Sequence, residues 1–261
     1  MKLNRPVDHE TELTLAICSE EPTVLCDKVA TLQEIEGFSL IPGPPLTIHD
    51  TYFDTQDRTL RRKSWALRIR IVGKKRLITA KGPPTVLDSG LVSRTEIERE
   101  WSCSALEELR ALLEELGARL SAGSSPFCES DPVRAMLELG LSVIQRRHVI
   151  RLSRQVAPKG AKKDAWAEFV IDSVSYDFGS QSVRHFELEI ELIKFGMTHE
   201  LKRLAEALKR LYGDALRPWP HGKLSTGLAI ETLLRDSGLR GLVRAGCLLP
   251  AAYEKIAANL S

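Results

Sequence analysis

The chain has 261 residues, 43% of them hydrophobic and 28% charged, and its 37 basic and 35 acidic side chains leave a formal net charge of +2. This balance is typical of a globular protein and excludes a nucleic-acid binder that works through bulk positive charge, so any anion site must come from local clustering of charge. No apolar run approaches the ~20 residues of a membrane-spanning helix and no signal-peptide pattern follows Met1, so we expect a cytoplasmic protein with neither a membrane nor a nucleic acid as partner.

The hydrophobic pattern switches repeatedly between the period of two typical of strands and the spacing typical of helices. In chain order it predicts strand 9–17, helix 21–36, strands 46–54, 64–72, 75–81 and 92–101, helices 104–117 and 131–139, strands 143–153, 166–177 and 184–193, helices 198–212 and 224–235, and a helical tail at 240–259. Proline, glycine and serine mark loops at 42–45, 82–84 and 121–126. The sequence therefore predicts a body dominated by about eight strands.

Two of the predicted helices begin with a recognisable signal. Ser104 followed by Glu107 forms a capping-box pattern before an apolar stripe. Asp131 precedes Pro132, and proline is favoured at the first position of a helix. These signals place the two helix starts at 104 and 131.

The five cysteines are scattered through the chain and form no CxxC pair. They are Cys18, Cys26, Cys103, Cys128 and Cys247. An odd number without metal-ligand spacing indicates neither a zinc site nor a disulfide framework, and it fits a reducing compartment.

Several predicted strands carry charges of a single sign on one face. The acidic faces are Glu10/Glu12, Glu96/Glu98/Glu100 and Glu187/Glu189/Glu191, and the basic face is Arg68/Arg70. One such strand alone is typical of a solvated outer face, but like charges repel, and their repetition across the sheet favours compensating partners. Carboxylates suit a divalent cation such as Mg²⁺, and arginines suit phosphate groups, so the pattern indicates a site for a metal–polyphosphate complex.

The segments that carry these charges resemble, in order and over about residues 9–235, the CYTH superfamily of triphosphate tunnel metalloenzymes. The matching segments are ETELT at 10–14, TYFDT at 51–55, LRIR at 67–70, TAKG at 79–82, RTEIE at 94–98, ID at 171–172, FELEIE at 186–191 and GKLS at 222–225. The resemblance implies an α+β fold: an eight-stranded antiparallel β-barrel, or tunnel, with a charged interior and helices packed outside. It assigns residues 1–236 to this domain and leaves 237–261 as a C-terminal helical extension.

The resemblance also implies roles for individual side chains. The implied metal ligands for Mg²⁺ or Mn²⁺ are Glu10, Glu12, Glu187, Glu189 and Glu191, and the implied phosphate ligands are Arg68, Arg70, Lys81, Arg147 and Lys223. Glu10, Glu12, Lys81 and Asp172 form the implied catalytic set, in which Asp172 positions a metal or water. Thr14, Glu96 and Glu98 are implied supporting residues, and Arg94 faces either the tunnel or its rim.

The sequence departs from the family pattern in two places. Thr14 stands where the signature has lysine, which removes one phosphate contact unless Lys2 or Arg5 replaces it. The sixth strand reads Gln145-Arg146-Arg147 in place of Lys-x-Arg, and the register favours Arg147 as the ligand with Arg146 as the alternative.

The activity implied by the resemblance is metal-dependent hydrolysis of a triphosphate, with inorganic triphosphate as the leading substrate and thiamine triphosphate or a nucleoside triphosphate as further substrates. Two alternatives stay open. One is a class IV adenylyl cyclase, and the other is a non-catalytic or weakly active module that binds polyphosphate or a nucleotide. A homodimer is an assembly that the sequence allows.

Overall fold

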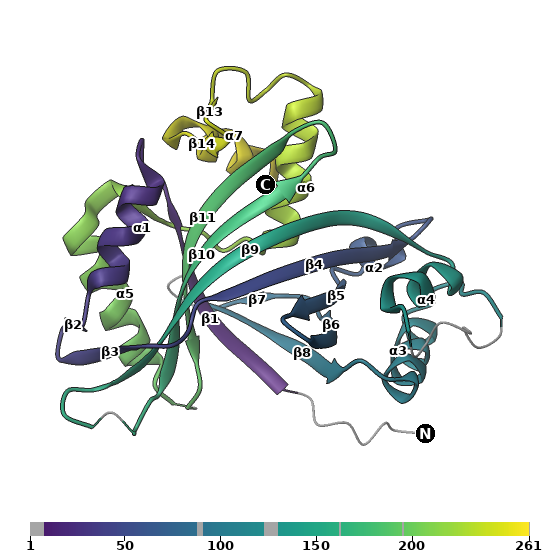
Figure 1. The fold of residues 1–261 in the computed structure, drawn as a ribbon, viewed down its shortest axis with the longest axis horizontal. Coiled ribbons are helices and arrows are strands. Elements are labelled where there is room, and N and C mark those ends of the chain that lie inside the picture. Colours follow the sequence, from purple (N-terminus) through teal and green to yellow (C-terminus); the bar gives the residue numbers. More distant parts are fainter. Residues whose placement is uncertain (1–7, 88–90, 123–129, 162, 195, 261) are drawn as a thin grey trace. The chain divides into compact units, whose positions relative to one another are not determined.

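The computed structural model describes residues 8–87, 91–122, 130–161, 163–194 and 196–260. The strands in these residues are β1 (Asp8–Ile17), β2 (Glu34–Ile35), β3 (Phe38–Pro42), β4 (Leu46–Thr55), β5 (Ala66–Val72), β6 (Lys75–Lys81), β7 (Thr85–Val86), β8 (Val92–Glu100), β9 (Leu141–Pro158), β10 (Ala167–Asp177), β11 (Ser182–Leu192), β12 (Leu216–Pro218), β13 (Val243–Arg244) and β14 (Cys247–Leu248). The helices are α1 (Pro22–Thr31), α2 (Thr59–Arg62), α3 (Cys103–Glu115), α4 (Pro132–Glu138), α5 (Thr198–Tyr212), α6 (Lys223–Arg235) and α7 (Pro250–Leu260), with a 3₁₀ turn at Gly213–Ala215. Figure 1 labels these elements.

The strands follow one continuous path of hydrogen-bonded neighbours. Their order is β12-β1-β8-β6-β5-β4-β9-β10-β11-β14-β13, and β1 also pairs with β11. This additional pairing is antiparallel and joins Glu12 to Glu191 and Thr14 to Glu189 in register. The ring of β1, β8, β6, β5, β4, β9, β10 and β11 is therefore closed, which confirms the predicted eight-stranded antiparallel barrel with helices outside.

The chain divides into two compact units, and each is described by itself. The first comprises the described parts of residues 1–10, 48–85 and 94–147, and the second those of 11–47, 86–93 and 148–261. The predicted division into 1–236 and 237–261 stays a prediction. None of the described helices is long and apolar enough to cross a membrane.

The core of the first unit lies between its strands and helices α3 and α4. Leu67 and Ile69 of β5 pack in one buried cluster with Leu109 of α3 and Met136 of α4. Residues two apart on a strand share a face, so the arginines that alternate with these apolar residues lie on the opposite, inner face. Figure 1 shows α3 and α4 beside each other in this unit.

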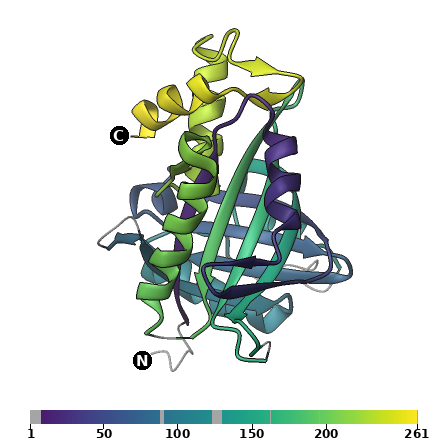
Figure 2. The ribbon, with the colours of Figure 1, turned by 90° about the vertical axis from the view of Figure 1, so that its left-hand side faces the viewer.

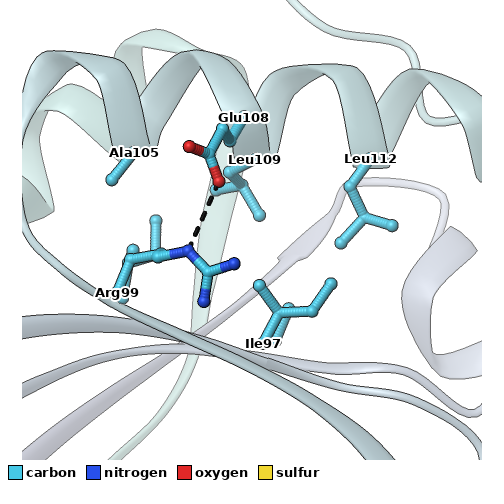
Figure 3. A pocket seen from close by; sticks show the side chains of 8 residues that line it. Ile97, Arg99, Ala105, Glu108, Leu109 and Leu112 are labelled. Atoms are coloured by element: carbon cyan, nitrogen blue, oxygen red, sulfur yellow. Dashed lines mark ion pairs between the residues drawn. The ribbon is translucent and has the colours of Figure 1, made fainter. Parts of the chain in front are cut away.

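A cavity of about 20 Å³ lies under α3, where the helix packs on β6 and β8. Figure 3 shows the Arg99 guanidinium reaching across it to the Glu108 carboxylate, with 3.5 Å between Nε and Oε2. Ile97 and Leu112 form part of the apolar lining. The cavity belongs to the layer between helix and sheet.

The core of the second unit lies between its strands and helices α1 and α5. Leu15 and Ile17 of β1 belong to one buried cluster with Val29 of α1 and Leu204 and Leu208 of α5. Figures 1 and 2 both show α1 and α5 lying over the outer face of the strands in this unit. Truncating one such leucine to alanine typically costs about 2–5 kcal/mol of unfolding free energy.

The helices predicted at 21–36 and 104–117 have different bounds in the structure. The helix expected at 21–36 ends at Thr31, because Leu32 is extended and a left-handed turn at Glu36 and Gly37 pairs β2 with β3, a strand that the sequence did not reveal. The helix expected at 104–117 begins one residue earlier, because the Ser102 side chain accepts the Ala105 N–H and caps it in place of Ser104. Asp131 caps α4 as predicted.

The tail expected as one helix at 240–259 is only partly helical. Residues 243–248 form the short hairpin of β13 and β14, with a left-handed turn at Ala245 and Gly246, and helix α7 begins at Pro250. The apolar residues of this segment are too few to show a clear period, so the pattern alone does not distinguish a short hairpin from a helix.

Candidate functional site

In the first unit, a buried aspartate binds two arginines directly. Asp50 on β4 is 1% exposed and lies opposite Arg70 of β5 in the antiparallel register. Arg70 donates from Nε at 2.8 Å and from Nη2 at 2.9 Å to the two Asp50 oxygens. Arg147 of β9 donates to Oδ2 from Nε at 3.1 Å and from Nη2 at 2.8 Å. The Asp50 carboxylate therefore fixes the direction of both guanidinium groups.

Tyr52 binds the arginines from the same face of β4. Its hydroxyl accepts from Arg68 Nη1 at 3.2 Å and also from Arg147 Nη2. The Arg147 guanidinium lies 4.5 Å from the centroid of the Tyr52 ring, a cation–π arrangement. Burial alone would raise the pKa of Tyr52, but Arg147 and Arg68 lower it below its ordinary value.

This group, which we call the arginine group (Asp50, Tyr52, Arg68, Arg70 and Arg147), carries more positive than negative charge. Arg68 Nη1 lies 3.8 Å from Asp50, so three guanidiniums approach one carboxylate, and Arg68 Nη2 also lies 4.0 Å from Glu96 and 3.9 Å from Glu98. Burial alone would raise the pKa of Asp50, but Arg68, Arg147 and Arg70 hold it well below its ordinary value. Arg68 Nε is buried with no hydrogen-bond acceptor among the described residues. The arrangement offers directed N–H donors to an anion.

A second charged group in the first unit surrounds Glu10 at the start of β1. Lys81 Nζ lies 2.9 Å from Oε1 and 2.7 Å from Oε2 of Glu10, and Arg94 Nε donates to Oε2 at 3.2 Å. Lys81 also contacts Glu96 at 3.2 Å. Glu98 accepts the Thr79 hydroxyl at 2.9 Å. The Glu10 carboxylate is thus held by two cations on neighbouring strands.

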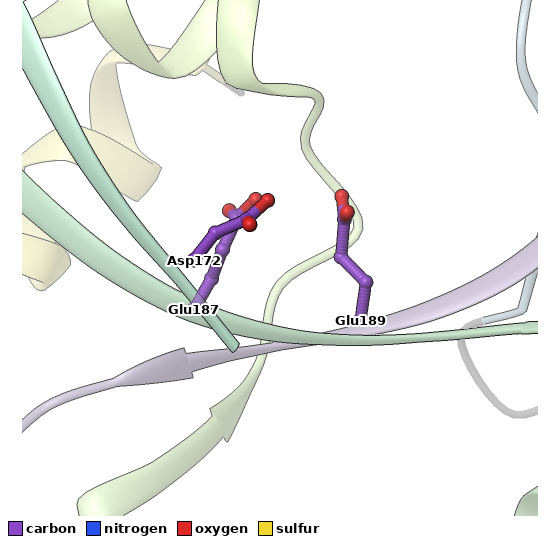
Figure 4. A group of neighbouring side chains, drawn as sticks. All are labelled: Asp172, Glu187 and Glu189. Carbon is purple, nitrogen blue, oxygen red and sulfur yellow. The ribbon is translucent and has the colours of Figure 1, made fainter. Parts of the chain in front are cut away.

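In the second unit, three carboxylates converge, and we call them the acidic trio (Asp172, Glu187 and Glu189). Figure 4 shows them on β10 and β11, and their nearest ligand oxygens all lie within 4.8 Å of one another. Asp172 and Glu187 are direct partners in the antiparallel register. Asp172 is 0% and Glu187 1% exposed. Buried carboxylates this close repel unless cations compensate them.

Two basic side chains compensate the acidic trio. Lys223, the first residue of α6, contacts Asp172 at 3.1 Å, Glu189 at 2.5 Å and also Glu187. Arg151 of β9 donates to both Asp172 oxygens at 2.9 and 2.6 Å and to Glu189 at 3.0 Å. Burial alone would lower the pKa of Lys223, but the three carboxylates raise it well above its ordinary value. Both cations are therefore charged at neutral pH.

The remaining predicted residues lie on the same strands with different surroundings. Glu12 is 6% exposed and lies opposite Glu191 on β11, and Thr14 is buried opposite Glu189. Within the described residues, the group with metal-ligand geometry is the acidic trio, and it does not include Glu10, Glu12 or Glu191. The predicted ligand roles of these three residues stay predictions.

The register preferred for the sixth strand agrees with the structure. Arg147 is 3% exposed and lies in the arginine group, whereas Arg146 is exposed. Lys2 and Arg5, the predicted substitutes for the missing lysine, lie outside the described residues. Asp54 of the TYFDT segment has a local role, because it accepts the backbone N–H groups of Leu60 and Arg61 at the start of α2.

Sequence reasoning assigned no role to four residues: Asp50 and Tyr52 in the arginine group, Arg151 beside the acidic trio, and His185, whose Nε2 lies 2.7 Å from Oε2 of Glu187. Arg151 had a usable signal, since it continues the alternation of Gln145 and Arg147 along β9. Asp50 is a single acidic residue on its strand, and only its register with Arg70 reveals its role. His185 is two residues from Glu187 on β11 and shares its face.

The cysteines differ from the prediction in one respect. Cys103 is disulfide-bonded, whereas Cys18, Cys26 and Cys247 are free thiols. The sequence argued against a disulfide framework and did not reveal the bond at Cys103, because sequence spacing does not report which cysteines meet in space. Burial raises the pKa of both Cys18 and Cys26 to about 12.

Comparison with known proteins gives one family and several similar folds. A family model described as CYTH domain matches residues 27–215. A putative adenylyl cyclase from Hippeastrum, described as having a dominant triphosphatase activity, has 18% identity and a TM-score of 0.54, covering 87% of this chain and 96% of that one. A putative adenylate cyclase from Vibrio parahaemolyticus has 16% identity and a TM-score of 0.46, with 85% and 98% covered. No curated protein matches the sequence.

Proposed function

The chain belongs to the CYTH-domain family, and from that premise we propose that it hydrolyses a linear triphosphate, with inorganic triphosphate as its leading substrate. The observation that carries the proposal is the arginine group, in which three guanidiniums lie within 3.8 Å of the Asp50 carboxylate. Within the group one carboxylate faces three guanidiniums, with Glu96 and Glu98 within 4.0 Å of Arg68 alone, and a polyphosphate would add negative charge there. It also supplies oxygen acceptors for donors such as Arg68 Nε, which is buried without an acceptor among the described residues.

We assign the phosphates to Arg68, Arg70 and Arg147, with Lys81 as a further ligand. Arg68 is 7% and Arg147 3% exposed, so their charge is weakly screened by water. Asp50 and Tyr52 position all three guanidiniums before substrate arrives, which reduces the entropy lost on binding. Because positioning and electrostatic stabilisation dominate phosphoryl transfer, no protein nucleophile is required.

We assign a divalent cation, Mg²⁺ or Mn²⁺, to the acidic trio. Its three carboxylates provide the oxygen donors that such cations prefer, and their spacing within 4.8 Å fits ligands of one ion. Lys223 contacts all three carboxylates, so an ion bound there requires the ammonium group to move away from them. A bound ion would supply charge neutralisation to phosphate oxygens.

Lys223 then has two partners in this proposal. Its ammonium group balances the acidic trio in the metal-free protein, and with a divalent cation held by the trio it would be able to serve as a phosphate ligand. The backbone of Lys223 is held in place, because the Tyr176 hydroxyl donates to the Lys223 carbonyl at 2.8 Å. The side chain can therefore change partners without displacing the start of α6.

The test measures phosphate, diphosphate and cyclic AMP released from inorganic triphosphate, thiamine triphosphate and ATP with Mg²⁺ or Mn²⁺. Arg68→Met removes charge-assisted contacts and should lower kcat/KM for triphosphate by roughly 10–150-fold, the equivalent of about 1.5–3 kcal/mol. Arg146→Met, an exposed neighbour of Arg147, is the matched control and should leave turnover unchanged. Equal activity in Arg68→Met and wild type would reject the phosphate assignment.

A non-catalytic binding module is the second candidate. It is favoured by Thr14, which provides no charge opposite Glu189, and by the contacts of Lys223 with the whole acidic trio. Binding of triphosphate without release of any product would select this function. Release of cyclic AMP and diphosphate from ATP would select a cyclase.

A further inference from the structure

One carboxylate of the acidic trio is held by a buried histidine. His185 and Glu187 are two residues apart on β11, so their side chains share a face. Nε2 of His185 lies 2.7 Å from Oε2 of Glu187, and the two side chains are 0% and 1% exposed. Because this contact is short and shielded from solvent, it restricts the rotation of the Glu187 carboxylate.

The other ring nitrogen of His185 faces the C-terminal helix. The Tyr253 hydroxyl of α7 lies 3.3 Å from Nδ1 of His185. Burial raises the pKa of Tyr253 well above its ordinary value, so the hydroxyl keeps its proton. His185 therefore lies between two polar partners, with Nε2 toward Glu187 and Nδ1 toward Tyr253.

The C-terminal segment is firmly attached where it presents Tyr253. β14 pairs with β11 at Arg184 and Cys247, and the Arg184 N–H donates to the Gly246 carbonyl at 2.7 Å. Tyr253 is 1% exposed. The Trp219 ring packs at 5.6 Å from Tyr253 and at 6.1 Å from His185, between ring centroids. The hydroxyl therefore has a defined position relative to the histidine.

We propose that His185 and Tyr253 are positioning residues that hold Glu187 in the orientation for binding a divalent cation. The residues after 237 then complete the acidic trio through Tyr253 instead of forming a detached appendage. This inference rests on the proposed function, because it requires the acidic trio to bind a cation. Hydrogen-bonding partners of metal ligands typically contribute 10–100-fold to metal affinity.

The experiment titrates the full-length protein with Mn²⁺ and follows the free ion by electron paramagnetic resonance. His185→Leu should weaken Mn²⁺ binding by roughly 10–100-fold. His185→Gln should recover part of the loss, because its amide places a donor near the position of Nε2. Tyr253→Phe removes only the hydroxyl and should give a smaller loss. Tyr212→Phe, on α5 of the same unit, is the matched control and should bind Mn²⁺ like wild type.

Each outcome decides the proposal. Unchanged Mn²⁺ affinity in His185→Gln and Tyr253→Phe, with or without a lower Tm, would reduce His185 and Tyr253 to packing residues and overturn it. If His185→Leu does not fold, these two milder variants decide. Absence of Mn²⁺ binding by wild type would reject the cation assignment of the proposed function and this inference with it. Wild-type binding with unaltered variants rejects the inference alone.

Discussion

Replacing Lys223 by methionine removes the cation that contacts all three carboxylates of the acidic trio. Arg151 then remains as the single positive partner in these contacts, facing three negative charges in a buried environment. Removing one partner of a buried ion pair typically costs about 3–5 kcal/mol, because the remaining charge is left without compensation. We expect Lys223→Met to lose about this much unfolding free energy in metal-free buffer.

A divalent cation should reverse most of that loss. If Mn²⁺ binds the acidic trio, Lys223→Met lacks the competing ammonium group and should bind Mn²⁺ more tightly than wild type. At a Mn²⁺ concentration 100 times the Kd, binding stabilises the folded state by about 2.7 kcal/mol. Urea unfolding with and without Mn²⁺ measures both effects. Lys209→Met, an exposed lysine on α5, is the matched control and should change neither quantity.

Two results would refute this reasoning. A Lys223→Met variant as stable as wild type in metal-free buffer would mean that the contacts of Lys223 contribute nothing net. A destabilised variant that Mn²⁺ fails to restore would mean that the acidic trio does not accept a divalent cation in place of the ammonium group. The first result removes the electrostatic argument, and the second removes the metal assignment.

Three further predictions concern residues away from the acidic trio. The pKa of Asp50 is lowered in the folded state, so its contribution to the free energy of unfolding is present above the ordinary pKa of 3.8 and is lost as the pH falls. Asp50→Asn should therefore flatten the decline of the free energy of unfolding between about pH 5 and pH 3. An unchanged slope in the variant would contradict this. Arg147→Met should lower the free energy of unfolding by about 1.5–3 kcal/mol, whereas Arg146→Met should change it by less than about 0.5 kcal/mol in urea titrations. Cys18 and Cys26, with pKa values of about 12, should react with a thiol reagent at pH 8 only after unfolding, and rapid labelling of the folded protein would disprove their burial.

The barrel strands were predictable because their signals are local. Alternation of apolar and polar residues needs only the neighbours along one strand, and β6 and α5 follow the predicted ranges to the residue. The short elements β2, β3 and α2 were not predicted, since they contain too few residues to show a period. Their positions depend on a left-handed turn at Glu36 and Gly37 and on the side-chain contacts of Asp54.

The site divides in the same way between local and long-range information. The sequence by itself determined which strand faces are acidic and which are basic, because residues two apart on a strand share a face whatever the strand pairs with. Only the tertiary structure decided the partners: Asp50 meets Arg147 across 97 positions, and His185 meets Tyr253 across 68. These contacts depend on strand register and on the docking of α7, and no pattern within a single segment reports either one.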